Sequence, residues 1–202
     1  MCIRDSNVTV KSFTFDLTSI ESITTINDSA GNPALEVKHV YGPSPIATDT
    51  LFEVTISITN IAGYKITDVR YNRSMDWDIP PSEFSEVVSA VGVDASVATG
   101  KLPRVLMSGN NGFMRPNPFN SAGSHNRGKG TGDFERYGPR DHGFTATFGF
   151  GELLCGENHN FISYYGAAEN RATLEAALAS ESIPLYSTVS YTHLTLPTIL
   201  LV

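Results

Sequence analysis

The sequence predicts an all-β fold, an antiparallel two-sheet sandwich of the immunoglobulin-like or jelly-roll-like kind, on two observations. Residues 52–59 alternate strictly between apolar and polar side chains. After a turn at 60–63, a second alternating run places Val69, Tyr71, Met75, Trp77 and Ile79 on one side. Because the side chains of a strand point to opposite faces in turn, both runs predict strands with one buried and one wet face. Such strands form antiparallel sheets that pack their apolar face on a second sheet.

The first third of the chain predicts further strands. Residues 8–17 are rich in Thr, Val and Phe, and their alternation slips between Val10 and Phe13, which predicts a β-bulge or burial on both faces. Residues 24–26 and 35–41 are also strand-like, and a turn at 27–33, which contains Asn, Asp, Gly and Pro, separates them. We expect the long run that starts at Val69 to end at Pro80, because proline cannot donate to a ladder.

The rest of the chain alternates strand-like runs with one helix and one long loop. The strands are predicted at 84–93, 104–107, 143–150, 160–165 and 183–187, with 160–165 pairing back on 143–150. Residues 168–180 predict a short helix with an apolar stripe near the C-terminus. Residues 108–132 hold six glycines and five asparagines without any periodicity, so we expect a long Gly/Asn-rich loop.

Composition excludes some classes of function. The formal net charge of −7 repels phosphate backbones, so nucleic acid is not an expected partner. Hydrophobic residues make up 41%, enough to bury a core, and the chain holds two cysteines, Cys2 and Cys155. No nucleophile elbow, phosphate-binding loop or zinc pattern is present.

Both ends of the chain resemble translated sequencing-adapter read-through. We therefore expect residues 1–6 and 189–202 to be artefacts. Residues 7–188 are expected to form a single β-sandwich domain, a truncated fragment of a longer protein whose signal peptide and anchor lie outside it. The apolar run 199–202 is too short to cross a bilayer, so no membrane span is expected in this fragment.

Several segments carry a resemblance to a known kind of module. They are 41–45, 52–60, 110–113, 138–143, 148–151, 164–168 and above all 68–81, with its Met-Asp-Trp-Asp-Ile block. Over residues 37–187 the chain resembles a β-sandwich module of predicted exported bacterial proteins, often of the PEP-CTERM cell-surface type. The run 52–60 is also similar to immunoglobulin-like surface repeats. The resemblance implies an extracellular or cell-surface location and assigns no catalytic residue.

Asp76 and Asp78 are the candidate metal ligands. As neighbours on one strand face, their side chains would lie roughly 7 Å apart. Carboxylates in that arrangement could supply oxygen ligands for calcium or serve glycoside hydrolysis. A solvated strand face is the interpretation that we favour, with calcium as the possible cofactor.

Four residues are assigned structural roles. The phase of Trp77 places its ring in the core. Arg73 falls on the same inner face, where a guanidinium needs a partner, for which Asp141 is the first choice and Glu152 the second, unless a bulge turns Arg73 outward. His142 follows Asp141 in sequence, and we expect it to make structural hydrogen bonds rather than to act in a catalytic pair.

The sequence therefore predicts a protein that is not an enzyme. We expect a structural or adhesive module of a secreted or cell-surface bacterial protein, with a cell-surface polysaccharide or protein as possible partner. The alternative is a carbohydrate-binding module of a larger extracellular enzyme. A row of solvent-facing aromatic side chains would favour the alternative, whereas an inward Trp77 favours the first. The sequence assigns no ligand-binding residue.

Overall fold

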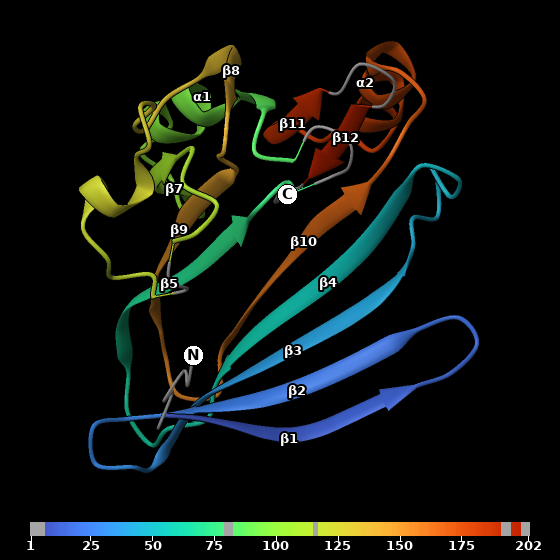
Figure 1. Ribbon diagram of the computed structural model, residues 1–202. Helices are drawn as coiled ribbons and strands as arrows, with labels where there is room; N and C mark the ends of the chain where they lie inside the picture. Colours follow the sequence, from blue (N-terminus) through green and yellow to red (C-terminus); the bar gives the residue numbers. More distant parts are fainter. Residues whose placement is uncertain (1–6, 79–82, 115–116, 191–194, 199–202) are drawn as a thin grey trace.

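The computed structural model describes residues 7–78, 83–114, 117–190 and 195–198 (Figure 1). The chain is mostly β-strand, every strand pair among these residues is antiparallel, and a short helix lies near the C-terminus, as predicted. The larger sheet has the order β1 (Val8–Phe15), β2 (Ile20–Asn27), β3 (Pro33–Pro43), β4 (Leu51–Asn60), β10 (Asn158–Gly166), β12 (Thr195–Thr198), β11 (Tyr186–Ser190), β6 (Glu86–Val91), β8 (Phe134–Arg140). The smaller sheet has the order β5 (Ile66–Met75), β9 (Phe144–Leu153), β7 (Arg104–Gly109). The helices are α1 (Val93–Ala98), the 3-10 helix η1 (Ala122–His125) and α2 (Arg171–Ser180).

Residues of both sheets share one hydrophobic core. From the larger sheet, Val54, Ile56 and Ile58 of β4 are buried; the side of this sheet on which they lie is called the inner face below. Phe161 of β10 stacks on Phe150 of β9, with ring centroids 4.8 Å apart. The Trp77 side chain is buried in the same core, as the alternation predicts.

The N-terminal strand carries the irregularity that the sequence predicts. The register between β1 and β2 shifts between Val10 and Ser12, which is a β-bulge at Lys11. The shift places Phe13 and Phe15 on the same face as Val8 and Val10, because one extra residue reverses the alternation of a strand. Lys11 itself points the other way and forms an ion pair of 2.6 Å with Glu36.

The predicted hairpin between 143–150 and 160–165 is wrong. β9 pairs with β5 and β7 in the smaller sheet, whereas β10 pairs with β4 along its whole length in the larger sheet. The segment 154–157 is therefore a crossover between sheets. The segment 61–65, which joins β4 to β5, makes a second crossover, and both lie at the bottom of Figure 1.

Asn60, at the end of β4, joins the two crossovers. Its side chain is 1% exposed. The amide nitrogen donates to the carbonyls of Tyr64 (2.8 Å) and Leu153 (3.0 Å). The amide oxygen accepts the Ala62 N–H, and the Asn60 backbone bonds to Glu157 and Gly156. Because an amide has two donors and an acceptor oxygen, one side chain satisfies backbone groups of both connections.

Three further elements differ from prediction. The long strand β5 ends at Met75, so Asp76 and Asp78 follow the strand instead of sharing a strand face; residues 79–82 lie outside the described residues. β8 and α1 were not predicted. β8 lacks alternation because its pairing with β6 shifts register twice, and Gly138 has φ 145° where a Cβ would meet the Glu86 carbonyl.

The helix α2 confirms the expected C-terminal helix. It begins one residue after Asn170, whose side chain accepts the Thr173 N–H (2.9 Å) as an N-cap. Leu174, Ala177 and Leu178 form its buried stripe and pack with Leu51 and Tyr164, against the outer face of β4 and β10.

The role of Asn60 can be tested by the substitution Asn60→Ala. It would leave the buried Leu153 carbonyl and Ala62 N–H without this partner, so we expect the free energy of unfolding to fall by about 2–3 kcal/mol. Chemical denaturation measures the change. The exposed Asn158→Ala should cost less than about 0.5 kcal/mol; equal effects for the two variants would contradict this role.

Candidate functional site

The structure brings a third acidic residue to Asp76 and Asp78. Asp141, which lies between β8 and β9, offers a carboxylate oxygen to the group, and one oxygen of each residue lies within 4.8 Å of the others. Asp76 is half-buried, and the other two are exposed. Burial, with the nearby Asp78 and Asp141 charges, raises the pKa of Asp76 above its usual value. The three carboxylates repel one another when ionised.

This acidic group has the donor chemistry of a calcium site. Calcium takes six to eight oxygen ligands, and three carboxylates can supply about half of them. A competing cation is nearby, since the Arg127 guanidinium lies 4.0 Å from the Asp141 carboxylate and donates to the Asp141 carbonyl (3.0 Å). Arg127 therefore offsets part of the negative charge.

Asp141 is held in place by a buried polar network around His142. The His142 Nδ1 accepts from the Asn110 amide (3.1 Å), so its Nε2–H donates to the Glu86 carbonyl (2.9 Å). The Glu86 carboxylate accepts the backbone N–H groups of His142 and Phe84. Burial lowers the pKa of His142. Both ring nitrogens are engaged in structural bonds, as expected for this residue.

Asn110 extends this network into the segment between β7 and β8. Its amide oxygen accepts the backbone N–H groups of Arg127 and Lys129, both at 2.9 Å. Its amide nitrogen donates to the Arg127 carbonyl (3.2 Å) as well as to His142. A fully buried asparagine thus fixes the path of a segment that the sequence shows only as Gly- and Asn-rich.

Arg73 does not pair with Asp141 or with Glu152, so both predicted partners are wrong. Glu152, near the end of β9, instead forms an ion pair with Lys65 (2.9 Å). Arg73 does face the inner layer, as predicted, where its guanidinium lies 5.0 Å from the ring centre of Tyr165 and 5.7 Å from that of Tyr71. The alternation predicted correctly which face of the strand Arg73 occupies. The residues near its guanidinium, however, depend on how the two sheets pack against each other.

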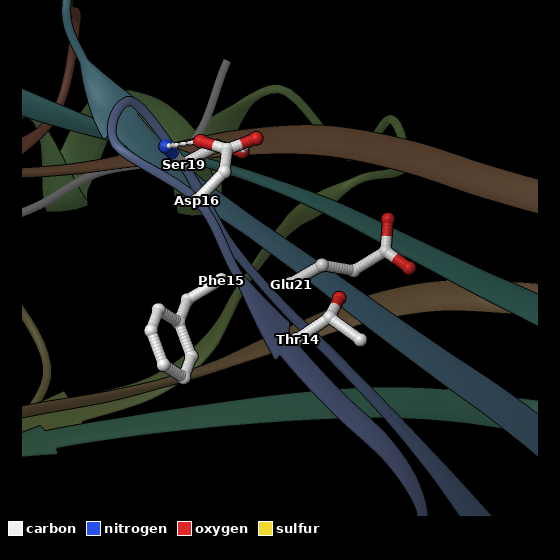
Figure 2. Close-up of a pocket in the computed structure, with 5 residues that line it drawn as sticks. All are labelled: Thr14, Phe15, Asp16, Ser19 and Glu21. Carbon is white, nitrogen blue, oxygen red and sulfur yellow. Dashed lines mark hydrogen bonds between the residues drawn. The ribbon is translucent and has the colours of Figure 1, made fainter.

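A shallow hollow lies at the turn between β1 and β2, lined by Thr14, Phe15, Asp16, Ser19 and Glu21 (Figure 2). The Asp16 carboxylate is already hydrogen-bonded within the turn, because it accepts the backbone N–H groups of Thr18 and Ser19, both at 2.7 Å. These bonds lower the pKa of Asp16. Figure 2 shows the Phe15 ring on the opposite side of the hairpin from Thr14 and Glu21. The hollow is part of a turn, and Phe15 points to the other face.

Sequence reasoning missed the exposure of three aromatic residues on the inner face. Phe52 alternates with the core residues of β4 and was expected to be buried, but it is 56% exposed. Phe13 and Phe15 are 62% and 77% exposed. The slip of alternation after Val10 was the available signal for their shared face. Their exposure depends on how far the second sheet extends, which no local pattern records.

Comparisons with known proteins give no relatives: no family model matches the chain, and no curated protein or solved structure matches it. Within the described ranges, none of the helices has the length and apolar character needed to cross a bilayer.

The Asp76 substitution Asp76→Asn tests the repulsion within the acidic group. With the folded-state pKa raised, the charge of Asp76 opposes folding above that pKa, and the penalty disappears below the unfolded value of 3.8. We expect Asp76→Asn to raise Tm at pH 7 in metal-free buffer and to leave it unchanged at pH 3. The exposed Asp49→Asn, an equal change of charge, should not raise Tm.

Calcium should relieve the same repulsion by binding the three carboxylates. We expect added Ca²⁺ to raise the Tm of the unmodified chain and to shift that of Asp76→Asn less. If added Ca²⁺ leaves the Tm of both the unmodified chain and Asp76→Asn unchanged, this group does not bind calcium.

A second pH dependence arises from His39. Burial, with the nearby Arg73 charge, lowers the pKa of His39 to about 4, from 6.5. Because the unfolded chain takes up this proton near pH 6.5 and the folded chain near pH 4, the free energy of unfolding should fall as pH falls through that window. His39→Gln should flatten this part of the curve. Denaturation at several pH values measures it, and an unchanged slope in the variant would contradict the assignment.

Proposed function

We propose that this chain is a non-catalytic β-sandwich module, structural or adhesive, of a secreted or cell-surface bacterial protein. Two antiparallel sheets with a shared core support the sandwich architecture. The location follows from the resemblance of residues 37–187 to exported bacterial modules. The fold acts as a scaffold that presents a surface.

One observation carries the binding role: large apolar side chains are exposed together on the inner face of β1, β2 and β4. Phe13, Phe15 and Phe52 are each more than half exposed, and Ile20 is 41% exposed. Neighbouring exposed apolar residues on a rigid surface mark a site of interaction. Three buried polar residues are engaged in structural bonds, since His142 and Glu86 bond to backbone, and His125 bonds to Ser121 and Thr147.

The same observation favours the second candidate, a carbohydrate-binding module of a larger extracellular enzyme. Sugar rings stack on exposed aromatic side chains, and a row of them was the feature expected to distinguish this class. Trp77 is buried and cannot stack on a sugar, but three exposed phenylalanines, Phe13, Phe15 and Phe52, lie on the inner face. The two candidates share the binding surface and differ in the protein to which the module is joined.

A glycan array with the purified chain tests the proposal. We expect binding of cell-surface polysaccharide at micromolar strength, and loss of most of it in Phe15→Ser, because the ring provides an exposed contact. Phe119→Ser is the matched control, since Phe119 is 60% exposed but contacts Arg70 instead of lying on the inner face. No binding to any glycan or bacterial surface would contradict the adhesive role.

A further inference from the structure

The inner face continues from the core out to the edge of the larger sheet. Residues opposite one another in neighbouring antiparallel strands share a face. One row runs from Phe15 through Ile20 and Tyr41 to Val54. The row beside it runs from Phe13 through Ser22 and His39 to Ile56. Exposed rings on β1 therefore lie on the same surface as the buried residues of β4.

A third row extends this surface onto β10. Phe52 lies opposite Tyr165 in the β4–β10 ladder, and both are on the inner face. Phe52 is exposed, whereas Tyr165 is partly buried and packs against the core. In Figure 1, β5 stands across from β10, and β1 and β2 extend away from it. The smaller sheet thus covers one end of the inner face and leaves the other open.

Arg73 projects from β5 onto this surface. Its Nε and Nη2 atoms are out of reach of water and have no hydrogen-bond partner among the described residues. Arg70 on the same strand uses those two atoms as a fork, which holds the Asp68 carboxylate at 2.8 and 2.7 Å. Arg73 as a whole is partly buried, but N–H groups of a charged side chain that are shielded from water are costly without a partner. Arg73 therefore offers an unused fork that matches a carboxylate.

We propose that this surface binds an acidic carbohydrate, whose uronic-acid carboxylate bonds to the Arg73 fork while its sugar rings stack on the exposed phenylalanines. The inference rests on the proposed binding function and names its ligand class. Tyr165 contacts the Arg73 guanidinium and pairs with the exposed Phe52 in the ladder, so we expect its ring to shift when the carboxylate enters from solvent. Tyr71 and His39, joined by a 3.0 Å hydrogen bond, form the back of the site.

Charge and size decide the ligand class. Arg73 is the one cation that stacks on these tyrosines among the described residues, so a singly charged carboxylate fits better than a doubly charged phosphate. The chain carries a net charge of −7, which repels ligands with more than one charge per sugar more strongly than a uronate with one. Phe15 lies opposite Val54 across three strand spacings, and Phe52 is two residues further along β4, so the backbones of Phe15 and Phe52 lie about 16 Å apart. That span suits an oligosaccharide more than a single sugar.

Titration calorimetry with oligogalacturonate and with its methyl ester tests the inference. The acid should bind the unmodified chain about ten- to a hundredfold more tightly than the ester, because the ester cannot accept a bidentate charged bond. Arg73→Met should lose this preference and bind both ligands equally. The variant keeps an apolar stem against Tyr165 and removes an unpaired charge, so its Tm should not fall. Arg136→Gln, the same change of charge at an exposed position of β8, should bind as the unmodified chain does.

The outcomes separate this inference from the proposed function. Equal binding of acid and ester by the unmodified chain, or an unchanged preference in Arg73→Met, overturns the role of Arg73 and leaves a neutral-glycan module. Absence of binding to either ligand, with binding to other glycans on the array, overturns the uronate assignment alone. A dimer that Phe13→Ser converts to monomer would instead make this surface an interface between two copies.

Discussion

The arrangement of this molecule depends on one buried amide. The chain passes between its two sheets after β4 and again after β9, and the Asn60 side chain bonds to backbone groups at both places. Each crossover exposes carbonyl and N–H groups that no ladder pairs, and such groups are costly when buried. Asn60 satisfies them with one set of contacts. The position of β5 and β9 over β4 and β10 follows from this joint.

That position determines which part of the inner face is covered. The smaller sheet has three strands and the larger sheet has nine in the described residues, so the smaller one cannot hide the whole surface. β4 and β10 contribute buried residues to the core shared with the smaller sheet, whereas Phe13 and Phe15 of β1 stay exposed. The same alternation of side chains therefore gives a dry interior on β4 and an open apolar surface on β1. The bulge at Lys11 keeps Phe13 and Phe15 on this surface.

Buried polar groups hold the opposite end of the molecule. Asn110, His142 and Glu86 bond to one another and to backbone, and this network fixes the segments before β8 and β9. The Asp76, Asp78 and Asp141 group lies beside it, at the exposed rim. Arg73 contrasts with these residues, because its fork is desolvated without a carboxylate. A satisfied network stabilises a fold, whereas an unsatisfied charge in contact with an open surface favours a ligand.

The sequence by itself determined the all-β class, most strands, an irregularity near Val10, the helix after Asn170 and the burial of Trp77. These features depend on periodicity and local hydrogen bonding, which neighbouring residues define. The tertiary structure alone decided that β10 pairs with β4, that Asp141 joins Asp76 and not Arg73, and that Phe52 is exposed. Alternation tells which residues share a face, but it does not tell which sheet a strand joins or what covers that face. Those outcomes depend on contacts between residues far apart in the chain.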